Sequence, residues 1–141
     1  VLTMLLRDAG RLLPRRLVLM SPWTDMTASG KSYRERRDAD PMITMNYIQA
    51  VRAAYAPGRE LSSPMLSPLF GDFDRFPPVL IQVGTNEILM SDSVRLRDRL
   101  VQAGIPCRLE VWPDMWHVFQ MFPMKKASQA MDSVGRFLLE T

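Results

Sequence analysis

The sequence predicts an α/β fold in which a mostly parallel sheet of three strands carries helices on both faces. Three apolar segments, 17–20, 79–83 and 107–112, have the length and pattern of strands, and helical patterns separate them. Parallel strands need crossover helices that pack on the sheet, so this alternation is typical of a doubly wound sheet. A sheet of three strands leaves at least one bare edge, which a stable domain normally covers. We therefore expect the C-terminal part of a larger sheet.

The first elements follow from their boundaries. The opening helix is expected to end at Gly10, because glycine adopts positive φ without steric cost. The chain starts at Val1 without a capping residue, which leads us to expect a helix cut from a longer protein. The continuous apolar run 17–20 fits a strand buried on both faces, and Pro22 stops it.

The middle of the chain is less regular. Residues 33–57 are expected to be helical but weakly amphipathic, with Asp40 and Pro41 resetting the chain direction. Residues 60–78 are rich in turn formers and contain scattered apolar residues, which predicts an ordered surface connection.

Two long helices are expected in the second half. Ser91 or Asp92 is expected to cap a helix that ends at Gly104. The last helix carries apolar residues at spacings of three and four: Ala127, Ala130, Met131, Val134, Phe137 and Leu138.

Composition excludes several classes of protein. The 141 residues suffice for one domain, and 47% of them are hydrophobic. A net charge of +3 is too small to argue for nucleic acid, and no apolar run reaches the roughly 20 residues of a membrane span. The single cysteine, Cys107, permits no intrachain disulfide and is interpreted as a small core residue. No phosphate-binding loop or metal-ligand spacing is present, so we expect no cofactor and no metal.

The candidate chemistry lies in two loops that follow predicted strands. Glu87 comes after the second strand and His117, the only histidine, after the third. Parallel strands end at the same sheet edge, so the two side chains are expected within reach of each other. A carboxylate that accepts the imidazole Nδ1–H leaves Nε2 free as a general base.

Structural alternatives remain open for these residues. A histidine beside Trp116 and Phe119 is about as often a satisfied, partly buried side chain, and Glu87 could complement a helix dipole. Asp92 is read first as a cap or first-turn residue, and Asp114 as a turn former. No Gly-x-Ser-x-Gly elbow occurs, and Ser21 and Ser91 lack its flanking glycines, so the nucleophile is missing.

Several motifs in order closely resemble the bacterial hormone-sensitive-lipase-like esterases, over essentially all 141 residues. They are LMSPWTD at 19–25, DPM at 40–42, SPM at 63–65, SPLF at 67–70, PPVLIQVG at 77–84 and VWPDMWHVF at 111–119. The resemblance implies that the strands are the sixth to eighth of an α/β-hydrolase sheet. It implies that Glu87 is the catalytic acid and His117 the catalytic histidine, with Asp92 as the second candidate acid.

The resemblance also implies parts beyond this chain. Residues 1–141 would be the C-terminal portion of one α/β-hydrolase domain, with 31–57 forming part of a cap over the active site. The oxyanion loop and the serine elbow are expected before Val1, and the isolated chain is expected to be inactive. Trp116, Phe119 and Met115 are expected to shape the substrate pocket, with simple packing as the alternative.

We therefore expect the intact protein to be a serine carboxylesterase that hydrolyses short-acyl esters through an acyl-enzyme. Its partner would be a small ester substrate, without nucleic acid or a membrane span; a homodimer stays open, and a cytoplasmic location is expected. The alternative is a non-catalytic remnant or interaction module that retains the half-sheet. A Gly-x-Ser-x-Gly motif shortly upstream would distinguish the two.

Overall fold

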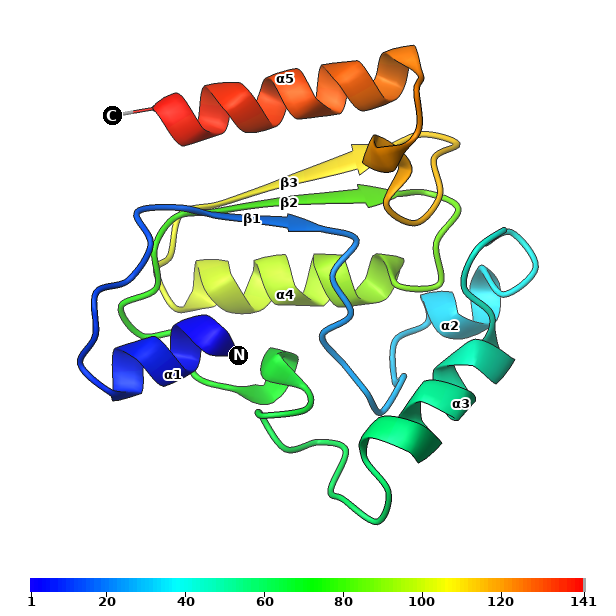
Figure 1. The fold of residues 1–141 in the computed structure, drawn as a ribbon, viewed down its shortest axis with the longest axis horizontal. Helices are drawn as coiled ribbons and strands as arrows, with labels where there is room; N and C mark the ends of the chain where they lie inside the picture. Colours follow the sequence, from blue (N-terminus) through cyan, green and yellow to red (C-terminus); the bar gives the residue numbers. More distant parts are fainter. Residues whose placement is uncertain (141) are drawn as a thin grey trace.

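The computed structural model describes residues 1–140, in which three parallel strands lie between two layers of helices (Figure 1). The strands are β1 (Leu17–Met20), β2 (Val79–Gly84) and β3 (Cys107–Trp112), in the order β1-β2-β3. Leu17 pairs with Val79, and Val79 pairs with Cys107. The predicted α/β class and parallel sheet are confirmed.

Helices cover both faces of the sheet. Helix α5 (Lys125–Leu139) lies over one face, and α4 (Met90–Gln102) and α1 (Leu2–Asp8) lie over the other (Figure 1). Side chains alternate along β2, so Ile81 packs with Leu96 on the α4 side while Leu80 packs with Phe137 on the α5 side. The sheet therefore lies between two apolar clusters, one on each of its faces.

The central strand is buried throughout, whereas β1 is only half-buried. Burial of residues 17–20 on both faces was expected from their continuous apolar run, and the structure corrects this. Strand β1 pairs only with β2 among the described residues, and Leu17 and Leu19 line an open cavity. An edge position gives a strand fewer neighbours than the centre of a sheet does.

Residues 31–57 form two short helices, α2 (Ser32–Glu35) and α3 (Met45–Tyr55). Between them the Asp40 carboxylate accepts the N–H groups of Met42 and Ile43, each at 2.9 Å. Asp40 and Pro41 thus change the direction of the chain, as predicted, and interrupt the helical segment between α2 and α3. Short 3₁₀ helices η1 (Pro68–Phe70) and η2 (Phe119–Met121) complete the element list.

Helix α4 begins two or three residues earlier than predicted. Its first residue is Met90, so Ser91 and Asp92 lie inside the first turn and cap nothing. Ser91 Oγ accepts the Ser32 N–H instead, at 2.9 Å. Gly10 and Gly104 follow α1 and α4 with positive φ, as predicted. No helix within residues 1–140 has the length and apolar character needed to cross a membrane.

Candidate active site

The ends of β2 and β3 bring Glu87 and His117 together. Glu87 Oε2 lies 3.4 Å from His117 Nδ1, with Glu87 fully buried and the His117 side chain 20% exposed. Both atoms are buried, and neither has a hydrogen-bond partner within the described chain. Unliganded catalytic pairs are often this long, and a small adjustment would form the hydrogen bond. Glu87 and His117 therefore meet at one edge of the sheet, as their positions after neighbouring strands predicted, whereas their catalytic roles stay a prediction.

The second oxygen of Glu87 is held by two donors. Oε1 accepts the Gly84 N–H at 2.6 Å and the Ser21 hydroxyl at 2.8 Å. Gly84 ends β2 and Ser21 follows β1, so the carboxylate is fixed from its own strand and from the neighbouring one. This arrangement directs Oε2 towards the imidazole.

Hydrogen bonds join the acid loop, residues 85–89, to the end of β3 and to the histidine loop, residues 113–118. Thr85 N–H donates to Trp112 O at 3.0 Å, and Asn86 N–H donates to Met115 O at 2.9 Å. Asp114 N–H donates to Thr85 Oγ1 at 2.8 Å, and the positive φ of Asp114 confirms its role in a turn. The two loops therefore form one bonded unit.

Gly84 permits this close approach. A Cβ on Gly84 would lie 2.1 Å from the Met115 carbonyl oxygen, a distance that no side-chain rotation relieves because the obstacle is backbone. Glycine is required here by contact with the histidine loop.

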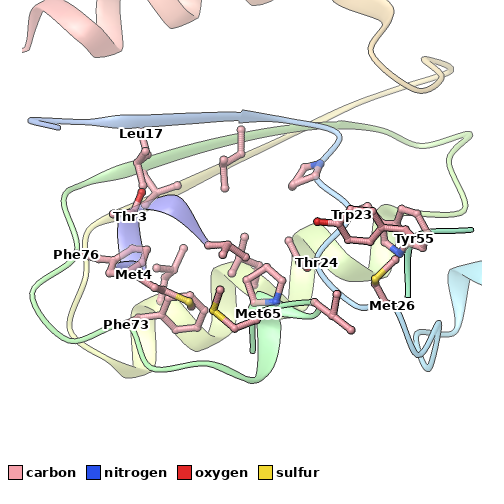
Figure 2. Close-up of a pocket in the computed structure, with 18 of the residues that line it drawn as sticks. Thr3, Met4, Leu17, Trp23, Thr24, Met26, Tyr55, Met65, Phe73 and Phe76 are labelled. Carbon is pink, nitrogen blue, oxygen red and sulfur yellow. The ribbon is translucent and has the colours of Figure 1, made fainter. Parts of the chain in front are cut away.

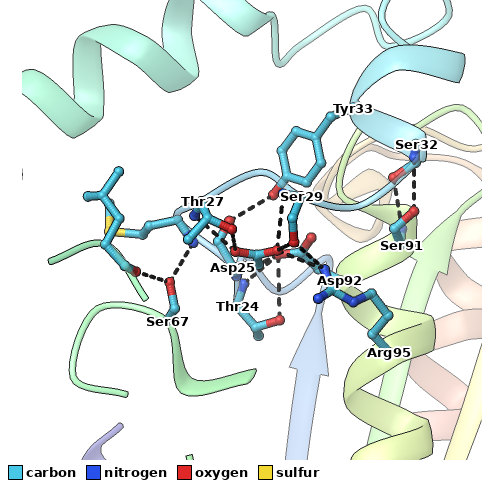
Figure 3. Close-up of polar contacts among 12 residues, drawn as sticks. Thr24, Asp25, Thr27, Ser29, Ser32, Tyr33, Ser67, Ser91, Asp92 and Arg95 are labelled. Carbon is cyan, nitrogen blue, oxygen red and sulfur yellow. Dashed lines mark hydrogen bonds and ion pairs between the residues drawn. The ribbon is translucent and has the colours of Figure 1, made fainter. Parts of the chain in front are cut away.

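Asp92 lies in a different polar cluster (Figure 3). Its Oδ2 accepts the N–H groups of Thr24 and Asp25, both at 2.8 Å, and it forms no ion pair with His117 among the described residues. Burial raises the pKa of Asp92 to about 6, although the two N–H donors act in the opposite direction. Asp92 anchors the loop after β1, so the structure does not bring the second candidate acid to the histidine.

Asp25 is the charged centre of the same cluster, and sequence reasoning missed it. Burial raises the pKa of Asp25, but hydrogen bonds from Ser29, Thr27 and Arg95 lower it by more, and the net pKa is below its usual range. Arg95 reaches Asp25 at 2.7 Å, and Thr27 N–H donates to it at 2.9 Å (Figure 3). The Asp-x-Thr spacing is an Asx-turn pattern that could have indicated this role.

The three residues expected to shape a substrate pocket lie near α5. Met115 and Phe119 form a core cluster with Ala127 and Ala130, and Trp116 packs against it. Their role towards a substrate stays a prediction. A cavity of about 540 Å³ lies instead on the other side of the sheet, between α1, β1 and α3 (Figure 2). Trp23 and Tyr55 stand at one end of that cavity and Phe73 and Phe76 towards the other, and neither Glu87 nor His117 lines it.

No group of three or more histidine, cysteine, aspartate or glutamate side chains within residues 1–140 is arranged to hold a metal ion.

Known proteins with similar sequences are ester hydrolases by name. The chain is 34% identical over 135 residues to an acetyl-hydrolase of Streptomyces hygroscopicus, covering 94% of this chain and 45% of that protein. It is 34% identical over 139 residues to an esterase of Acinetobacter venetianus, covering 96% of this chain and 46% of that protein. The chain thus spans about half the length of the curated relatives that it matches.

Solved structures similar to this chain are also esterases and lipases by name. The chain is similar to an esterase from the bacterial hormone-sensitive lipase family, with 38% identity and a TM-score of 0.93 over 96% of this chain and 46% of that one. It is also similar to a hormone-sensitive lipase from a metagenome library, with 31% identity and a TM-score of 0.93 over 96% of this chain and 47% of that one. Residues 1–121 match the family described as alpha/beta hydrolase fold, and the chain belongs to that family.

Proposed function

We propose that the whole protein is a carboxylic ester hydrolase that cleaves short-acyl esters through an acyl-enzyme, with Glu87 and His117 as the acid and base of a serine triad. The observation that carries this is the contact between Glu87 Oε2 and His117 Nδ1, two buried atoms that have no hydrogen-bond partner within residues 1–140. The relatives named esterase and acetyl-hydrolase support it.

The orientation of the His117 imidazole determines which nitrogen faces the acid and which can act as the base. With Nδ1 facing the acid, Nε2 lies on the far side of the imidazole and is free to take the proton of an attacking serine hydroxyl. That serine would come from the protein outside residues 1–141. The imidazolium formed would be stabilised by Glu87 and would return its proton to the leaving alkoxide, after which water attacks the acyl-enzyme by the same route.

Ser21 is unsuited to be that nucleophile. It is only 3% exposed, and its hydroxyl donates to Glu87 rather than to the imidazole. A nucleophilic serine needs the base as its hydrogen-bond partner and an open approach for the ester.

The test uses the full-length protein and its hydrolysis of p-nitrophenyl acetate. His117→Ala is expected to lower kcat at least about a thousandfold, because the general base is removed. The control Gln129→Ala, on an exposed position of α5, is expected to keep kcat within about twofold. Residues 1–141 alone are expected to show no turnover. Wild-type turnover by His117→Ala would contradict the proposal, and an inactive full-length protein would favour a non-catalytic module.

A further inference from the structure

The hydroxyl of Ser21 joins three parts of the site. Ser21 follows the last residue of β1, and its N–H continues the ladder by donating to Gln82 O at 2.8 Å. Its Oγ–H donates to Glu87 Oε1 at 2.8 Å, and the same oxygen accepts the Val118 N–H at 3.0 Å. One buried oxygen thus touches both the acid and the residue directly after the histidine.

The backbone is strained at both ends of this link. Ser21 has φ +47° and Val118 has φ +45°, the left-handed region that non-glycine residues rarely adopt and that is least favourable for a β-branched residue. Such conformations persist where surrounding contacts determine them and gather at functional sites. The two strained residues are hydrogen-bonded to each other beside the Glu87–His117 pair.

We propose that Ser21 is a positioning residue for the Glu87–His117 pair, an inference that rests on the proposed function. With Gly84 N–H it fixes Glu87 Oε1, so the carboxylate cannot rotate Oε2 away from Nδ1. Through Val118 it fixes the backbone that carries the imidazole. The position needs a group that donates and accepts at once, which a hydroxyl provides and a carboxylate or methyl group does not.

A second buried hydroxyl supplies a matched control. Ser67 Oγ donates to Leu61 O at 2.6 Å and accepts the Met26 N–H at 2.7 Å, so it also joins two loops with one donated and one accepted bond. It is fully buried, and within residues 1–140 its hydroxyl makes no hydrogen bond to Glu87 or to the histidine loop. Its loss reports what a purely structural hydroxyl contributes.

The experiment compares Ser21→Ala, Ser21→Gly and Ser67→Ala in the full-length protein by ester hydrolysis and thermal unfolding. Both Ser21 variants lack the hydroxyl, but glycine accepts positive φ without strain. We expect kcat to fall about tenfold in both with KM within about twofold, since a hydrogen bond to a charged group is lost. Ser67→Ala is expected to lower the unfolding midpoint comparably and to keep kcat within about twofold. Because the two Ser21 variants differ in backbone strain, the glycine variant remains informative if the alanine variant does not fold.

The outcomes separate the two proposals. If either folded Ser21 variant keeps wild-type kcat while Glu87→Gln and His117→Ala lose turnover, the positioning role is overturned and the proposed function stands. If Ser67→Ala lowers kcat as much as the Ser21 variants do, the effect is structural and the positioning role is again overturned. Full turnover by both Glu87→Gln and His117→Ala would overturn the proposed function itself.

Discussion

Two buried carboxylates near the sheet edge have different surroundings and therefore different uses. Glu87 offers one oxygen to fixed donors and the other to an imidazole. Asp92 directs one oxygen to the backbone of the loop after β1. The same residue class is thus used for chemistry at one position, in our proposal, and for loop anchoring at the other.

The anchoring carboxylate makes stability depend on pH. The folded pKa of Asp92 is about 6, against an ordinary value of 3.8. A raised folded pKa contributes stability that is fully present below about pH 4 and is lost as pH rises through about 6. We expect the free energy of unfolding of the wild type, minus that of Asp92→Asn, to fall by about 2.5 kcal/mol between pH 4 and 7.

Urea unfolding of both proteins at several pH values measures this difference. Asparagine keeps a carbonyl oxygen for the Thr24 and Asp25 N–H groups but cannot ionise, so it removes the titration and retains an acceptor. A difference that stays flat, or that grows with pH, would show that Asp92 is ionised in the folded protein at acidic pH.

At the scale of elements, two segments hold the acid loop: the histidine loop and residues 31–57. The histidine loop bonds to it through Asn86 and Thr85, and Asp40 of the 31–57 segment accepts the Ile88 N–H at 3.0 Å. Ser32 Oγ donates to the Ile88 carbonyl from the same segment. The assignment of residues 31–57 to a cap stays a prediction, but these contacts couple that segment to the loop that carries Glu87.

Because the two loops are in close contact at Gly84, a side chain at this position is expected to lower both stability and activity. In Gly84→Ala the new Cβ meets the Met115 carbonyl, and the histidine loop must move away from the acid loop. We expect about 2–3 kcal/mol of destabilisation and a loss of kcat.

Gly135→Ala is the matched control. Nothing lies within 4 Å of a Cβ at Gly135, inside α5, so alanine there is expected to stabilise by about 0.5–1 kcal/mol. Chemical denaturation of both variants, with ester hydrolysis of the full-length forms, measures the contrast. Equal effects of the two substitutions would show that the Gly84 contact does not constrain the loops.

At the scale of the whole molecule, the strands and the meeting of Glu87 and His117 could be predicted because they depend on local pattern and on a topological rule. Apolar runs identify strands, and parallel strands end at one edge. The contacts of Ser21 could not be predicted, since its partners lie 66 and 97 residues away in the sequence. The half-burial of β1 and the partners of Asp92 also depend on tertiary neighbours that no local pattern encodes.

The chain holds two of the three groups that the proposed mechanism needs, and it spans about half the length of relatives named acetyl-hydrolase and esterase. In the proposed mechanism, Glu87 and His117 act as one unit. Groups that act together in a triad show strongly non-additive losses, because removing one makes the other ineffective.

The most direct measurement is a double-mutant cycle of Glu87→Gln and His117→Ala in the full-length protein, with kcat/KM for p-nitrophenyl acetate as the readout. We predict that Glu87→Gln alone lowers kcat/KM at least about a hundredfold and that the double variant is no slower than His117→Ala alone. Losses that multiply across the cycle, or a nearly silent Glu87→Gln, would contradict this prediction.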